Sequence, residues 1–189
     1  MNILLELSGT TPLVMHNARL ADPLDPFAKE IAAINAKRIK TESDLTDRDH
    51  WEFLGGLYHD PDVGLHIPAR AVVATFVEAG KVTRQGTAVL RGFSVVTDRL
   101  PLAYDGPKKP EDLWAEPTHR WRTGVGVKQN TVMRMRPIFR RWSLAVEGEL
   151  MEDMLNPDDF RGICEKAGRS IGLLDARTLG YGRFTVAMA

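Results

Sequence analysis

Apolar and polar residues alternate in several short segments of the chain, and each such segment predicts a strand. The pattern is clearest where Trp142, Leu144 and Val146 are separated by polar or small residues. Alternation with a period of two is typical of a strand that buries one face. The expected strands are 2–8, 87–97, 142–150 and 183–188, with a shorter one over 100–104.

Helical spacing of apolar residues predicts two longer helices, over 69–79 and 157–168. The second has the stronger start signal, because Asn156 is a good N-cap and Pro157 suits the first helical position. The pair Asp25-Pro26 predicts a further helix in the same way, and Thr46 is expected to cap a short helix after it.

The order of these elements indicates the fold class. If the segments 10–67 and 99–140 are set aside as insertions, the order is strand–helix–strand–strand–helix–strand. This order is typical of a ferredoxin-like or RRM-like domain, an antiparallel sheet with helices on one face. We therefore expect a single α+β domain over residues 1–189 with two insertions.

Composition favours a folded, cytoplasmic protein. Apolar residues make up 43% of the chain, and no apolar run approaches the roughly 20 residues of a membrane helix. The N-terminal residues do not have the pattern of a signal peptide, so we expect a cytoplasmic location. The single cysteine, Cys164, excludes an intrachain disulfide and a thiolate zinc site, and its helical position predicts a buried side chain.

Charge is segregated along the chain, although the formal net charge is zero. Two stretches contain no Asp or Glu, a longer one over 117–146 and a shorter one over 79–97. The acidic residues concentrate in 42–52 and 147–159. Such segregation gives a neutral protein a local positive potential that attracts a polyanion. The acid-free segment 117–146 carries seven basic residues: Arg120, Arg122, Lys128, Arg134, Arg136, Arg140 and Arg141.

Residues 119–139 are predicted to form a long, protruding basic β-hairpin. With Gln129-Asn130 as its turn, cross-strand partners sum to about 259 and arginines occur on both faces. Interleaved Arg, Trp and Met suit a ribbon that binds single-stranded nucleic acid, with guanidinium groups on phosphates and Trp121 stacked on a base. A solvated basic arm, or an arm that docks on an acidic protein, remains the alternative. Trp114 is expected in a loop, where it could contact a neighbouring subunit.

No cofactor or catalytic motif is expected. The sequence contains no phosphate-binding P-loop, no nucleophile elbow and no His-Glu-x-x-His zinc motif. The best metal candidate is the group His59, Asp60 and Asp62, with remote help from Asp22, Asp25 and His16; it would imply a metal-dependent nuclease. Because Asp and Pro favour turns, 59–62 is interpreted as a turn and the protein as a non-enzyme.

Two resemblances extend this interpretation. The segment from Gly172 through Gly180-Tyr-Gly182-Arg-Phe resembles the glycine-rich loop of the RAMP superfamily, the RRM-like RNA-binding subunits of CRISPR effector complexes, although here Gly172 stands alone where that loop has two glycines. Segments 15–23, 55–58, 102–107 and 133–139 resemble a family of small bacteriophage proteins found among replication and recombination genes. That resemblance implies a phage protein that coats single-stranded DNA with a RAMP-like fold similar to a CRISPR backbone subunit. It also implies that the cytoplasm in question is that of a phage-infected bacterial host.

The expected function is sequence-independent binding of single-stranded DNA, with self-association into a filament or ring and no membrane contact. An RNA-binding subunit of the CRISPR type is the main alternative, since the sequence does not separate the two nucleic acids. The candidate contact residues are Arg19, Lys81, Arg84, Arg91, Arg120, Trp121, Arg122, Lys128, Arg134, Arg136, Arg177 and Tyr181.

Overall fold

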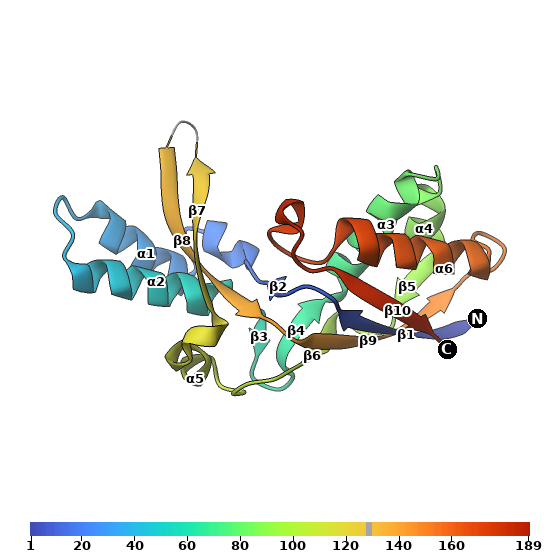
Figure 1. Ribbon diagram of the computed structural model, residues 1–189, viewed down its shortest axis with the longest axis horizontal. Helices are drawn as coiled ribbons and strands as arrows, with labels where there is room; N and C mark the ends of the chain where they lie inside the picture. The colour runs from blue at the N-terminus through green and yellow to red at the C-terminus, as the bar shows by residue number, and fades with distance from the viewer. Residues whose placement is uncertain (128–129) are drawn as a thin grey trace. The chain divides into compact units, whose positions relative to one another are not determined.

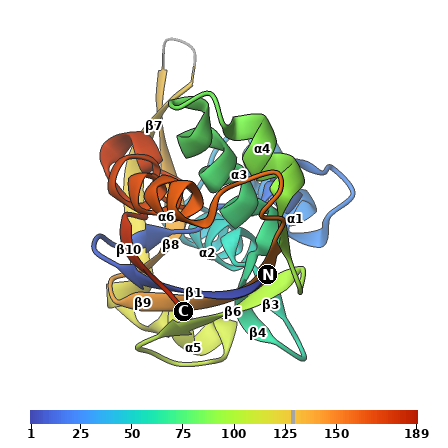
Figure 2. The same ribbon diagram turned by 90° about the vertical axis from the view of Figure 1, so that its right-hand side faces the viewer.

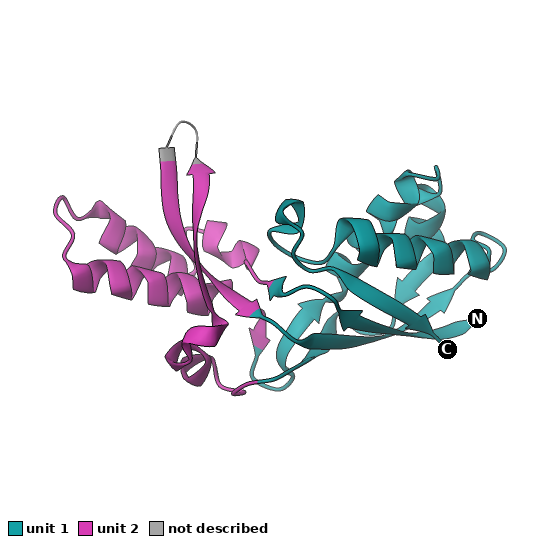
Figure 3. Ribbon diagram, in the orientation of Figure 1, with its two compact units in different colours: residues 1–13, 60–105, 139–189 teal, residues 14–59, 106–138 magenta. Residues whose placement is uncertain are grey.

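The computed structural model describes residues 1–127 and 130–189 (Figure 1). The chain is a mixed α+β protein with a mostly antiparallel sheet, as expected. It divides into two compact units (Figure 3): unit 1 comprises 1–13, 60–105 and 139–189, and unit 2 comprises 14–59 and 106–138. All residues of unit 2 thus lie within the two segments that were expected to be insertions, 10–67 and 99–140.

Unit 1 is built around an antiparallel sheet. Its neighbouring strands run in the order β10-β1-β9-β6-β4, and β5 also pairs with β9. Expected strands 142–150 and 183–188 correspond to β9 and β10. The strands are β1 (Asn2–Gly9), β4 (Gly64–Pro68), β5 (Phe93–Val95), β6 (Arg99–Tyr104), β9 (Trp142–Leu150) and β10 (Phe184–Met188). Two-residue strands, β2 (Leu13–Val14) and β3 (His59–Asp60), fall where the chain passes between units.

The helices of unit 1 cover one face of this sheet (Figure 2). An aromatic cluster joins the layers: the ring of Phe160 lies 4.7 Å from that of Phe93 and 5.8 Å from that of Phe76. All three side chains are buried, so this cluster is the centre of the core between sheet and helices. The helices are α3 (Ala69–Lys81), α4 (Gly86–Gly92), α6 (Pro157–Lys166) and the short turns η3 (Ala167–Ile171) and η4 (Arg177–Leu179).

The expected strand 87–97 is wrong over most of its length, because α4 occupies 86–92 and only β5 is extended. The buried residues of α4 are Gly86, Val89 and Gly92, a spacing of three that places them on one helical face. Val89 packs on α3, where a Cβ on Gly80 would lie 3.1 Å from its methyl group. This tertiary contact overrides the β-propensity of the segment.

Unit 2 combines two long helices with a pair of strands. Asp25 caps α1 as expected, since its carboxylate accepts from the backbone N–H of Phe27. Thr46 is not the cap of α2: that helix starts earlier, at a capping box formed by Thr41 and Asp44. The elements are η1 (Ala18–Ala21), α1 (Pro26–Ala36), α2 (Glu42–Gly56), α5 (Pro110–Ala115), η2 (Pro117–His119), β7 (Arg120–Val127) and β8 (Asn130–Phe139).

Strands β7 and β8 pair antiparallel in a register that differs from the expected one. Trp121 lies opposite Arg136 and Val127 opposite Asn130, so partners sum to 257 and Asn130 belongs to a strand. The expected turn residue Gln129 lies outside the described residues. Because the sum changes by two, each side chain stays on the face predicted for it, and only the pairing shifts along the ladder.

Candidate nucleic-acid interface

Two arginines of this strand pair, Arg122 on β7 and Arg134 on β8, are held by acidic residues of α2. The Nε of Arg122 donates to Asp49 Oδ2 at 2.9 Å, and the neighbouring Arg48 also contacts Asp49, at 3.1 Å. Asp49 is buried, whereas 47% of the Arg122 side chain is exposed. A guanidinium has five N–H donors in a planar fork, so a contact through Nε fixes its plane and leaves its outer edge toward solvent.

Glu52, one turn further along α2, orients an arginine of β8 in the same way. One carboxylate oxygen accepts from Arg134, and the other accepts from the backbone N–H of Met135 at 2.9 Å. Only 3% of the Glu52 side chain is exposed, against 31% for Arg134. The two acids therefore lower the net charge of the basic segment, and they also set the orientation of its arginines.

Aromatic side chains surround the start of β7. The guanidinium of Arg120 lies 4.9 Å from the ring centre of Trp114, a cation–π contact. Trp114 lies on α5 rather than in the expected loop, and its ring packs 5.4 Å from that of Phe53 and 5.0 Å from that of His50. Trp114 is thus part of the packing of unit 2. Trp121, the next residue along β7, is half-buried.

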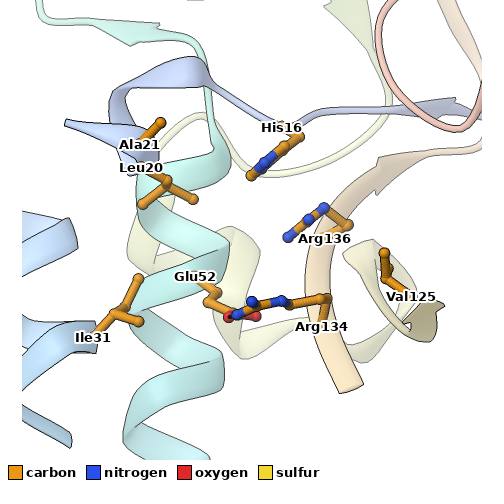
Figure 4. Close-up of a pocket in the computed structure, with 8 residues that line it drawn as sticks. All are labelled: His16, Leu20, Ala21, Ile31, Glu52, Val125, Arg134 and Arg136. Carbon is orange, nitrogen blue, oxygen red and sulfur yellow. Dashed lines mark hydrogen bonds and ion pairs between the residues drawn. The ribbon is translucent and has the colours of Figure 1, made fainter. Parts of the chain in front are cut away.

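A cavity of about 310 Å³ lies in unit 2 beside this ladder (Figure 4). Arg134 and Arg136 project into it from β8, and His16 lies on the wall facing Arg136. Arg136 is only 7% exposed, and one of its terminal nitrogens donates to the carbonyl of Met135 at 3.2 Å. Sequence reasoning missed this cavity, because its walls come from segments distant in the chain.

Arg19, on η1, is a further candidate of unit 2. Its Nε donates to Asp25 at 2.7 Å and its guanidinium lies 4.6 Å from the ring centre of Phe27. Both contacts hold the segment before α1, which gives Arg19 a structural role whatever it binds. Of the other candidate in this region, Lys128, nothing can be described, since it lies outside the described residues.

Five candidates belong to unit 1. Lys81, Arg84 and Arg91 are exposed around the start and end of α4, and Arg84 adopts a positive φ of 60°. Arg177 forms an ion pair with Glu78 at 2.8 Å, and Tyr181 is half-buried. The structure thus distributes the predicted contact residues over both units rather than on the strand pair alone.

The glycine-rich loop of unit 1 is packed backbone against backbone. Gly182 has a φ of +70°, and a Cβ there would lie 2.2 Å from the carbonyl oxygen of Leu173. Its N–H donates to Pro12 and its carbonyl accepts from Leu173. Position 182 requires glycine because the backbones of two neighbouring segments approach each other closely there. Gly180 differs, because its φ is +86° but a Cβ there would meet open space.

The open face of the unit 1 sheet carries acids. Glu6 on β1, with Glu147 and Glu149 on β9, are exposed, and the register places Glu147 opposite Leu4 and Glu149 opposite Asn2. An RRM stacks bases on aromatic residues of its sheet face. Carboxylates at these positions repel phosphate, so β1 and β9 do not present the aromatic stacking surface of an RRM here.

The metal candidate is used for a turn instead. Asp60 accepts from the backbone N–H groups of Asp62 and Val63, and these hydrogen bonds lower the pKa of its carboxyl. Asp60 is also paired with Arg99. Among residues 1–127 and 130–189, no group of three or more His, Cys, Asp or Glu side chains is arranged to hold a metal ion.

Cys164 is buried on α6, as expected, and burial raises the pKa of its thiol. No helix in the part of the chain that the structure describes is long and apolar enough to cross a membrane. Comparison with protein-family models gives no match, and comparison with curated proteins gives no significant relative.

Proposed function

We propose that this chain is a non-enzymatic protein that binds single-stranded DNA without sequence preference and assembles along it. The observation that carries the proposal is the strand pair β7–β8, which has no acidic residue of its own and aligns arginines with a tryptophan. Arginine provides planar donors for phosphate, and tryptophan provides a surface for base stacking, so together they suit a flexible strand.

The acids of α2 support this assignment of the contact surface. Asp49 takes Arg122 through Nε, and Glu52 takes Arg134 through one terminal nitrogen. Each arginine is therefore oriented before any ligand binds, and preorganised side chains lose less entropy on binding. The cation–π contact with Trp114 orients Arg120 in a similar way.

The finer fold assignment is part of the proposal. In unit 1 the strands β10, β1 and β9 are neighbours in that order, and β5 and β6 each pair with the other edge of β9. This order is the fourth, first, third and second strand of a ferredoxin-like or RRM-like domain, which supports a RAMP-like fold whose acidic sheet face does not take part in binding nucleic acid. The resemblance to phage proteins adds a role in phage DNA replication or recombination.

Assembly along the strand is supported by the separation of charge on one neutral chain. Exposed carboxylates on the sheet of unit 1 and the exposed Arg122 on β7 of unit 2 are complementary between copies, and a head-to-tail contact of this kind makes a filament or a ring. Light scattering with and without a long dT oligomer tests this part separately from binding itself.

The test of binding is fluorescence anisotropy with a labelled dT oligomer, with duplex DNA and single-stranded RNA as competitors. Binding to dT that duplex does not displace supports the proposal. Displacement by matched RNA at equal concentration would assign the protein to RNA instead. Absence of binding at low salt would contradict the proposal and leave β7–β8 as a surface for an acidic protein.

A further inference from the structure

The cavity of unit 2 has an apolar wall on its helical side. Leu20 and Ala21 of η1 and Ile31 of α1 line this wall, whereas Val125 of β7 lies on the strand side (Figure 4). Its volume, about 310 Å³, is at the lower end of the range of small-molecule sites, about 300–1,000 Å³. A ligand that fills it is therefore small and has an apolar, flat or compact part.

The opposite wall is cationic. Two guanidinium groups, those of Arg134 and Arg136, line the cavity together with a single carboxylate, that of Glu52. Both oxygens of Glu52 already accept hydrogen bonds, one from Arg134 and one from the backbone of Met135. Figure 4 shows both arginines extending from β8 toward the cavity, so an anionic group is favoured at this side.

The cavity is continuous with the strand pair. Val125 of β7 and Arg134 of β8 line it and belong to the ladder that is the proposed DNA contact. A nucleotide matches both walls, with the flat face of its base against the aliphatic side chains and its phosphate beside the arginines. Among the described residues that line the cavity, none is Phe, Tyr or Trp.

We infer that this cavity takes one nucleotide of the bound strand, with the base against Leu20 and Ile31 and its phosphate beside Arg136. The inference rests on the proposed function and adds a second mode of contact to it. Bases that cross β7 stack on Trp121, whereas the nucleotide in the cavity is separated from its neighbours and lies against aliphatic side chains.

The test uses dT oligomers shortened to the minimum length that one chain still binds, so that the ends fix the register, each with one 2-aminopurine at a different position. This base is dark when stacked and bright when it is unstacked against aliphatic groups, so occupancy of the cavity raises its fluorescence at a fraction of the positions. The expected result for the wild type is a several-fold rise there and no rise at the others. Anisotropy on the same samples measures binding independently.

Ile31→Phe narrows the cavity from a half-exposed helix position, and Arg136→Gln removes the buried charge. We expect Ile31→Phe to abolish the bright position while it weakens binding by no more than about tenfold, which is 1.4 kcal/mol. Arg38→Ala, an exposed cation between α1 and α2, should leave both signals unchanged.

Three outcomes are decisive. A bright position that is lost in Ile31→Phe supports the nucleotide site. Oligomer binding without any bright position, or with one that Ile31→Phe leaves intact, overturns the inference while the proposed function stands. No binding of any oligomer overturns both. Arg136→Gln removes a buried group, so its circular dichroism is compared with that of Ile31→Phe to show whether it is folded. If Arg136→Gln is unfolded, Ile31→Phe alone decides the test.

Discussion

Glu52 should be a main determinant of the stability of unit 2, and the change Glu52→Gln tests this. The side chain is 3% exposed and its two oxygens accept from Arg134 and from the backbone of Met135. Glutamine keeps the shape and can still accept from Met135, but it removes the negative charge beside Arg134. The change therefore isolates the ion pair from the backbone contact.

The expected loss follows from the burial of the two partners. Removal of one partner from a fully buried ion pair costs about 3–5 kcal/mol. Arg134 is 31% exposed, so water compensates part of its charge, and one hydrogen bond of Glu52 is retained in the variant. We expect Glu52→Gln to lower the free energy of unfolding by about 2 kcal/mol.

The assay is urea denaturation followed by tryptophan fluorescence. Three of the four tryptophans, Trp51, Trp114 and Trp121, belong to unit 2, so the signal reports chiefly on that unit. The double variant with Arg134→Gln should recover about 1 kcal/mol, because no charge is then left without its partner. Asp47→Asn, an exposed acid on the same helix, should stay within about 0.5 kcal/mol of the wild type.

Unfolding of Glu52→Gln and Asp47→Asn at the same urea concentration would show that the ion pair with Arg134 does not stabilise unit 2. A double variant that loses the sum of both single changes would show the same, since partners in contact must couple.

Three further results are expected. Gly182→Ala should destabilise unit 1 by more than about 2 kcal/mol through a backbone clash. Gly180 has a positive φ but open space around it, so Gly180→Ala should cost only about 1–2 kcal/mol. Equal losses of stability in thermal denaturation would argue against the clash at Gly182. Hydrogen bonds from Lys37 and Thr41 lower the pKa of Asp44 to about 2, so the wild type should lose stability as the pH falls from about 4 to about 2. Asp44→Asn should be less stable above that window and should lack this loss in acid titrations; the same acid loss in both proteins would contradict it. The buried thiol of Cys164 should react with a disulfide reagent only after denaturant is added, and fast reaction of the folded protein would disprove its burial.

The sequence predicts those parts of the fold that local signals determine. The alternation around Trp142 and the cap at Asn156 place β9 and α6 correctly, since each signal acts within a few residues. The segment 87–97 fails because Val89 packs on α3, a contact that no local pattern encodes. The expected cap at Thr46 fails for a different reason: Thr41 and Asp44 form a complete capping box one turn earlier.

The candidate site is only partly readable from the sequence. Charge segregation identifies β7 and β8, because like charges close in sequence stay close in a strand pair. The acids that orient their arginines lie on α2, 73 residues from Arg122 and 82 from Arg134, so only the folded chain brings them together. The cavity beside Arg136 is hidden in the same way, since its walls come from η1, α1, α2, β7 and β8.

The most direct test of the central claim is the salt dependence of dT binding by the wild type, Trp121→Ala, Arg122→Gln and the control Arg38→Ala. Each phosphate contact of a single strand contributes about 0.7 to the slope of log affinity against log salt. We predict a steep wild-type slope, a decrease of about 0.7 in Arg122→Gln, and a loss of about 1–3 kcal/mol in Trp121→Ala from stacking. A flat slope for the wild type, or affinities that Trp121→Ala and Arg122→Gln both leave unchanged, would contradict the assignment of β7–β8 as the DNA-binding surface.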